Sequence, residues 1–238
     1  MTTIAGNLQQ VRARIAQACA AAGRDPADVA LLAVTKAVAP DAVREAAACG
    51  QRAFGENYIQ EGVEKIALLA ADGAAPLQWH CIGPIQSNKT RLVAQHFDWA
   101  HTVDRLKVAE RLSEQRPVHL PPLAVCIQVN IDGGAAKSGV APQDAPALAR
   151  AVALLPGLRL RGLMTIPEPA PDFDAQLAVH QRARILFDDL RVELGLPHFD
   201  TLSMGMSADL EAAIHAGSTM VRVGTAVFGR RGGVDTGG

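Results

Sequence analysis

The sequence has few aromatic residues and nearly balanced charges. Aromatic side chains make up 4% of the 238 residues, and Tyr58 is the single tyrosine. Lys and Arg number 23 and Asp and Glu number 24, which gives a net charge of -1. Neither a nucleic-acid-binding surface nor an acidic or basic tail is therefore indicated. An anionic ligand would have to be bound by a local site.

Clustered cysteines and long apolar runs are also missing. The four cysteines, Cys19, Cys49, Cys81 and Cys126, form no C-x-x-C pair, so we expect free thiols rather than a zinc site. The apolar runs are far shorter than the roughly 18 residues that can span a bilayer, and no charged-then-apolar leader opens the chain. With 49% hydrophobic and 20% charged residues, we expect a folded cytoplasmic protein that does not enter membranes.

Short β-rich runs alternate with Ala- and Leu-rich helical stretches along nearly the whole chain. The predicted strands are 29–35, 53–57, 77–83, 99–103, 123–130, 158–166, 199–204 and 220–228. The predicted helices are 4–22, 41–49, 59–70, 88–95, 106–115, 144–154, 173–194 and 207–217. The strands start about 27 residues apart, close to the roughly 31 per unit of a 250-residue (β/α)8 barrel.

This pattern predicts an α/β protein with a single TIM barrel and an extra N-terminal helix. We expect one domain over residues 1–230 and a flexible tail over 231–238. The alternative is an open doubly wound sheet, but its usual G-x-G-x-x-G turn is absent. Thr35-Lys36-Ala37-Val38 follows the first strand instead.

In a barrel, activity belongs to the carboxyl ends of the strands. The residues that follow the predicted strands are Lys36, Glu56 with Asn57, Gly83 with Gln86 and Asn88, His101 with Asp104, Asn130 with Lys137, Met164 with Thr165, 203–207 and 222–225. Lys36 directly follows an apolar strand. A partly desolvated amine has a lowered pKa and attacks aldehydes more readily. The alternative is a rim lysine whose ammonium reaches water.

The loops after the last two strands carry a second signal, because barrels commonly bind phosphate there. They contain Ser203-Met204-Gly205-Met206-Ser207 and Val221-Arg222-Val223-Gly224-Thr225. Ser207 is predicted to cap a helix over 208–216, and Gly205 and Gly224 would let a ligand approach the backbone closely. The alternative is that these residues only make turns and cap the helix.

Arg222 is flanked by two valines that face the other way, so its guanidinium is predicted to point into the barrel. A buried cation must be paired or directed at a ligand, and a buried salt bridge is the alternative. An amine, a phosphate site and an arginine together indicate a phosphorylated aldehyde bound as an imine. Two such ligands are a sugar phosphate in a Schiff-base aldolase and pyridoxal 5′-phosphate (PLP).

Five stretches of the sequence resemble one family. They are AVTKAV (33–38), FGENYIQE (54–61), WHCIGPIQSNK (79–89), GLMTIP (162–167) and LSMGMSADLEAAIHAGSTMVRVGTAVFG (202–229). They resemble the YggS/PROSC-type PLP homeostasis proteins, one-domain relatives of the alanine racemase barrel. The loop after the fifth strand departs from the family pattern, because Asp132-Gly133-Gly134-Ala135-Ala136 precedes Lys137.

The resemblance implies a set of PLP-binding residues. Lys36 would hold PLP as a Schiff base, and Arg222 would face the pyridine nitrogen. The phosphate would be surrounded by Ser203, Met204, Ser207, Gly224 and Thr225, and Asn57 and His80 would belong to the pocket wall. The resemblance also implies a monomer whose PLP could pass to PLP-dependent apoenzymes.

An arginine at the ring nitrogen keeps its proton, so PLP would be a weaker electron sink than beside an aspartate. Alanine racemases use a second base, a tyrosine from a separate domain. Here Tyr58 follows the second predicted strand, where a packed or rim position is expected. We therefore expect a protein that holds, buffers or delivers PLP without turnover. The alternatives are an amino-acid racemase that uses Lys36 as its one base and a Schiff-base aldolase.

Overall fold

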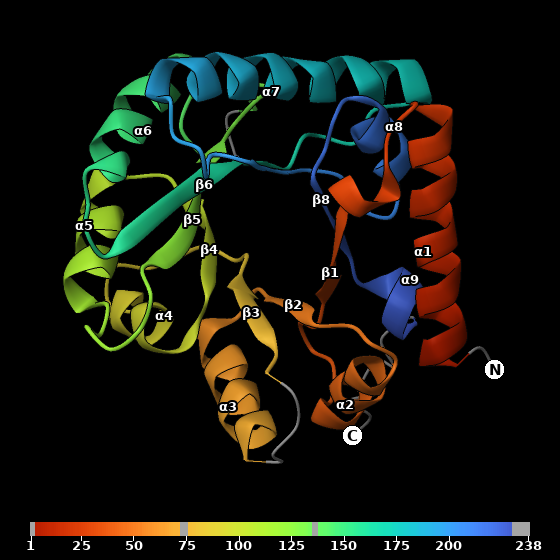
Figure 1. Cartoon of the computed structure of the whole chain (residues 1–238), viewed down its shortest axis with the longest axis horizontal. Helices are drawn as coiled ribbons and strands as arrows, with labels where there is room; N and C mark the ends of the chain where they lie inside the picture. The colour runs from red at the N-terminus through yellow and green to blue at the C-terminus, as the bar shows by residue number, and fades with distance from the viewer. Residues whose placement is uncertain (1–2, 72–75, 135–137, 230–238) are drawn as a thin grey trace, which may run out of the picture.

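The computed structural model describes residues 3–71, 76–134 and 138–229. Within them, eight parallel strands pair in sequence order and close into a barrel (Figure 1). The strands are β1 (Ala30–Val34), β2 (Ala53–Glu56), β3 (Gln78–Cys81), β4 (Trp99–Val103), β5 (Leu123–Val129), β6 (Leu158–Thr165), β7 (Thr201–Ser203) and β8 (Met220–Val223). Pairing of β1 with β8, with Leu32 opposite Arg222, closes the ring. The barrel prediction is confirmed.

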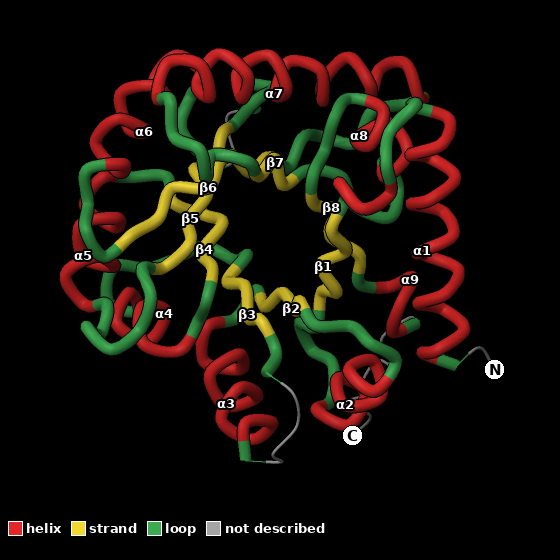
Figure 2. The backbone as a smooth tube through the Cα atoms, in the orientation of Figure 1, coloured by secondary structure: helices red, strands yellow, loops and turns green. Residues whose placement is uncertain are grey.

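Helices surround the ring of strands on all sides (Figure 2). They are α1 (Ile4–Ala21), α2 (Pro40–Ala48), α3 (Ile59–Ala70), α4 (Thr90–His96), α5 (Leu106–Gln115), α6 (Ala145–Ala153), α7 (Phe173–Leu194), α8 (Leu210–His215) and α9 (Thr225–Phe228), with 3-10 turns at Pro26–Asp28 and Pro142–Asp144. The main core lies between the helices and the outer faces of the strands, where large buried side chains such as Phe54, Leu160 and Phe187 pack.

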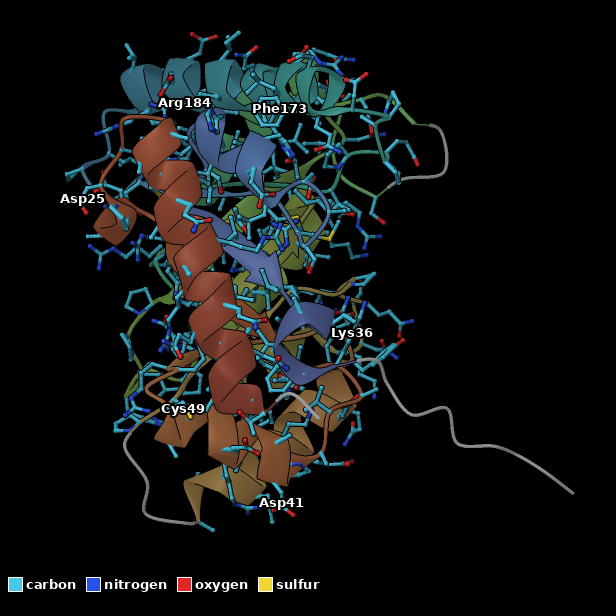
Figure 3. The ribbon with its side chains drawn as sticks, turned by 90° about the vertical axis from the view of Figure 1, so that its right-hand side faces the viewer. Asp25, Lys36, Asp41, Cys49, Phe173 and Arg184 are labelled. Atoms are coloured by element: carbon cyan, nitrogen blue, oxygen red, sulfur yellow. The ribbon has the colours of Figure 1, made fainter. Side chains whose placement is uncertain are left out.

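The extra N-terminal helix takes the place of a full helix after β8. Helix α1 contacts α2, α8 and α9, and it crosses the outside of the barrel beside the short α9 (Figure 3). Asn7 Nδ2 donates to the Val227 carbonyl at 2.9 Å, and Arg14 forms an ion pair with Glu211 of α8. Because α9 has a single turn, α1 supplies the apolar surface that covers β1 and β8.

Two predicted elements near the carboxyl end of the chain were wrong in their extent. The strand predicted over 220–228 ends at Val223, and residues 225–228 form α9. The β-branched residues of α9 favour a strand, but tertiary contacts with α1 hold the segment as a helix. The helix predicted to follow Ser207 begins at Leu210, after Asp209. Asp209 Oδ1 accepts from the Met206 amide, so this loop is held by Asp209 rather than by a Ser207 cap.

All four cysteines are free thiols, as expected. No helix in the described part of the chain is long and apolar enough to cross a membrane. The predicted tail over 231–238 lies outside the described residues.

Candidate functional site

Lys36 follows β1 at the carboxyl end of the barrel. Together with Gly224 and Thr225 it lines a pocket of about 210 Å³, and Figure 3 shows it beside α9. Its side chain is half-buried, and its amine makes no hydrogen bond or ion pair with any described residue. The amine is therefore available to react with a ligand in this pocket.

The backbone on both sides of Lys36 is fixed by a buried ionic cluster. Lys65 Nζ on α3 donates to the Thr35 carbonyl at 2.8 Å, to Glu56 Oε1 at 2.7 Å and to Glu61 Oε1 at 2.9 Å. Glu56 also accepts from the Thr35 hydroxyl at 2.6 Å. We call Glu56, Glu61 and Lys65 the clamp.

The clamp also holds an unusual backbone conformation. Ala37 has a φ of 54°, which places it in the left-handed region that non-glycine residues rarely adopt. Its amide donates to Glu61 Oε1 at 2.8 Å. Burial raises the pKa of Glu56, although Lys65 and Thr35 oppose this shift through hydrogen bonds. The local strain at Ala37 is therefore balanced by contacts that define where the Lys36 side chain begins.

The opposite wall of the pocket offers unpaired backbone amides. Within the described residues, the N–H groups of Gly224, Thr225 and Ala226 donate to no acceptor. The adjoining loop after β7 is held by Asp209, whose Oδ2 lies 2.9 Å from His180 Nε2. Hydrogen bonding to His180 and to the Met206 amide lowers the pKa of Asp209 against the opposing effect of burial. A row of free amides beside an amine suits a ligand that carries both an anion and an aldehyde.

Arg222 is buried inside the barrel, with 4% of its surface exposed. It donates to Ser203 Oγ and to the Thr165 carbonyl, both at 2.8 Å, and forms no ion pair with a described carboxylate. Burial lowers the pKa of Arg222 to about 10, so it remains a cation at neutral pH. Among the described residues, Arg222 therefore lacks the buried salt bridge that the sequence left open. The remaining alternative is that its charge is directed at a ligand.

Three strand ends near the site carry buried oxygens that have no protein partner among the described residues. They are Asn57 Oδ1 after β2, Asn130 Oδ1 after β5 and Thr165 Oγ1 at the end of β6. Such groups are costly to bury unless water or a ligand pairs with them. These oxygens could therefore pair with hydrogen-bond donors of a bound polar ligand or with water.

The predicted site residues are only partly brought together. Lys36, Gly224 and Thr225 share one pocket, whereas Asn57 lines a neighbouring pocket of about 520 Å³ with Tyr58 and Lys89. The remaining predicted residues lie elsewhere: Ser207 in the half-buried loop, Met204 in the core, and Ser203 and His80 fully buried inside the barrel. Lys137 lies outside the described residues.

Glu61 and Lys65 of the clamp were not singled out from the sequence. Their spacing of four residues on a predicted helix is a signal that could have indicated an ion pair, but only the tertiary structure shows that Lys65 also donates to the carbonyl of Thr35. No described group of three His, Cys, Asp or Glu side chains could hold a metal ion.

A parallel barrel with a lysine after its first strand and an arginine in its last strand has the architecture of an alanine racemase barrel. Residues 6–232 match the family described as alanine racemase, N-terminal domain. A relative from Pseudomonas aeruginosa PAO1, called pyridoxal phosphate homeostasis protein, is 63% identical over 231 residues, 97% of each chain. One of the same name from Escherichia coli K12 is 54% identical over 97% of this chain and 98% of its own. The chain belongs to the pyridoxal phosphate homeostasis protein family.

Solved structures agree with this assignment. PipY from Synechococcus elongatus PCC7942, solved with PLP bound, superposes with a TM-score of 0.82 at 35% identity, covering 95% of this chain and 100% of PipY. Alanine racemase from Corynebacterium glutamicum superposes with a TM-score of 0.66 at 21% identity. This likeness covers 96% of this chain but 61% of the racemase, and at such identity it shows the fold alone.

Proposed function

We propose that this protein binds PLP at the carboxyl end of the barrel, as a Schiff base on Lys36, and serves PLP homeostasis by holding and releasing the cofactor without turnover. The observation that carries the proposal is the pocket that joins the unpaired Lys36 amine to the free amides of Gly224, Thr225 and Ala226. The names of the 63% and 54% identical relatives, and PLP in the PipY structure, support it.

PLP supplies an aldehyde that a lysine amine can capture reversibly. The clamp would hold the Lys36 backbone still while its amine reacts. The free amides, with the Ser207 hydroxyl on the adjoining loop, would bind the phosphate. Arg222 would donate to the ring nitrogen and, being unable to give up its proton readily, would keep the ring from accumulating negative charge. Met204 would pack below the phosphate loop.

The proposal also covers the location, the oligomeric state and the partners of the protein. We propose that the protein is a cytoplasmic monomer and that PLP-dependent apoenzymes receive the PLP it releases. Reversible capture on Lys36 is the chemistry that such exchange requires.

The test is chemical trapping on the purified protein. PLP is added, the visible absorption band is recorded, and the adduct is reduced with borohydride and located by mass spectrometry. We expect the adduct on Lys36, no band in Lys36→Ala, and normal labelling in Lys89→Ala, because Lys89 lines the neighbouring pocket. Absence of a band in the wild-type protein after adding PLP, or an adduct at another lysine, would refute the proposal.

A further inference from the structure

A row of hydrogen-bonded side chains crosses the interior of the barrel. Arg222 Nη1 on β8 donates to Ser203 Oγ on β7 at 2.8 Å, and Ser203 Oγ lies 3.0 Å from His101 Nδ1 on β4. His101 Nε2 lies 2.9 Å from His80 Nδ1 on β3, and His80 Nε2 lies 3.0 Å from Gln78 Oε1. We call Gln78, His80, His101 and Ser203 the relay.

The relay connects the two ends of the barrel. Arg222 lies two residues before Gly224 of the candidate pocket, whereas Gln78 is the first residue of β3 and is exposed at the opposite end. Ser203, His101 and His80 between them are all 0% exposed. The Trp99 ring is nearly parallel to the His80 ring at 5.1 Å between centroids, which fixes the plane of that imidazole.

The direction of the hydrogen bonds in the relay follows from the amide oxygen of Gln78 together with the neutral charge of the two imidazoles. Gln78 Oε1 only accepts, so His80 Nε2 donates to it. A neutral imidazole carries one hydrogen, so His80 Nδ1 accepts from His101 Nε2, and His101 Nδ1 accepts from the Ser203 hydroxyl. A guanidinium only donates, so Ser203 Oγ accepts from Arg222.

Both imidazoles are neutral in this arrangement. Burial lowers the pKa of His80 to about 3, with a smaller contribution from the Arg161 charge. Burial, followed by the charges of His80 and Arg222, also holds the pKa of His101 well below its usual value. A carboxylate in the same place would neutralise Arg222. A neutral acceptor instead fixes the guanidinium while leaving its charge available to a ligand.

We propose that His101 is a positioning residue for Arg222: it accepts from Ser203 in a single tautomer, set by His80 and Gln78, and so holds the guanidinium towards the ligand pocket. The inference rests on the proposed function only where Arg222 is taken to meet bound PLP. His101 itself is 0% exposed and would act through Ser203.

The first measurement is made on the wild-type protein without PLP. Nitrogen-15 NMR of labelled histidine reports the tautomer and charge of each ring, and the relay residues are assigned with the variant His101→Asn. We expect both relay histidines to carry hydrogen on Nε2 and to be neutral at pH 7. Hydrogen on Nδ1 of His101, or a protonated His101 at pH 7, would overturn the proposal.

The second measurement compares two replacements of His101. Asn can place Oδ1 near the position of Nδ1 and still accept from Ser203, whereas Leu cannot. In His101→Leu we expect the Arg222 N–H signals to broaden by exchange and the dissociation constant for PLP to rise roughly tenfold or more, as the loss of a hydrogen bond to a charged group implies. In His101→Asn we expect slow exchange and an affinity within about threefold of wild type.

Cys126→Ala is the matched control, because Cys126 is fully buried in the same interior cluster as Trp99 and is not part of the relay. It should bind PLP as wild type does.

Ser203→Ala removes the same link between His101 and Arg222 with a smaller change. It should weaken PLP binding even if His101→Leu does not fold. Normal PLP binding by His101→Leu or Ser203→Ala would overturn the positioning role. PLP binding by His101→Asn that is as weak as that by His101→Leu would overturn it too. Failure of the wild-type protein to bind PLP would refute the proposed function, while the Arg222 exchange rates would still decide the positioning role.

Discussion

Lys36 and Arg222 are held in contrasting ways, although both are cations near one pocket. The backbone around Lys36 is fixed by the charged clamp, and its amine has no partner within residues 3–71, 76–134 and 138–229. Arg222 is fixed through its own side chain by neutral acceptors. A free amine can react and a fixed guanidinium can orient, so the two kinds of support match the roles proposed for the two residues.

Lys65 should be essential to the clamp. Replacing it by Met leaves the Glu56 carboxylate, which is 1% exposed, without its cation, and breaking a buried pair in this way costs about 3–5 kcal/mol. Urea unfolding measures this loss. The double variant Lys65→Met with Glu56→Gln should recover part of it, because no buried charge remains. A loss in Lys65→Met below about 1 kcal/mol would mean that the clamp behaves like an exposed pair.

The relay histidines predict a pH dependence of stability. Their pKa values are lowered in the folded state, so the unfolded chain binds protons first as the pH falls below about 6.5. The stability that they contribute is therefore present above that pH and is lost on acidification. For His80 this loss continues down to about pH 3. Between pH 7 and 5 His80 should account for about 2 kcal/mol of lost unfolding free energy, and the lowered pKa of His101 adds a loss of the same sign. His101→Asn should therefore lose less unfolding free energy than wild type over this range. Equal slopes in denaturant titrations would contradict the buried, neutral assignment.

Among the secondary-structure elements, the regular units were predictable and the irregular ones were not. Helices 59–70, 106–115 and 173–194 and the strand 99–103 have the bounds predicted from apolar periodicity. Helix α9 was predicted as strand because Thr225, Val227 and Phe228 favour strands, whereas the contacts that hold it as a helix come from α1 at the other end of the chain.

The site shows the same division between local and tertiary information. Lys36 was identified because it ends a strand, and Arg222 because it alternates with apolar neighbours. His80 and Ser203 were placed around the ligand, but the structure buries both within the relay. Sequence spacing shows that they point inward, yet not how far below the barrel mouth each lies, which depends on the stagger of neighbouring strands.

Helix α1 should control the element that carries the proposed phosphate site. Asn7 Nδ2 bonds the Val227 carbonyl in α9, and α9 begins directly after Gly224. In Asn7→Ala, hydrogen exchange at the bonded amides of Val227, Phe228 and Gly229 should accelerate while the amides of β1 and β8 stay protected, since loss of one hydrogen bond costs about 1 kcal/mol locally. Thr3→Ala removes the cap of the same helix without removing this bond and should leave α9 unchanged. Unchanged exchange in Asn7→Ala would show that packing alone holds α9.

For the molecule as a whole, the decisive question is whether the barrel that holds PLP also turns over amino acids. The one tyrosine of this sequence, Tyr58, is 62% exposed and lines the neighbouring pocket rather than the pocket of Lys36. We expect no interconversion of D- and L-alanine or of D- and L-serine by the PLP-loaded protein, measured by chiral chromatography. Tyr58→Phe should bind PLP with unchanged affinity, because this change removes only an exposed hydroxyl. Racemisation that disappears in Lys36→Ala would establish an enzyme with one base, and racemisation that also disappears in Tyr58→Phe would assign Tyr58 as the second.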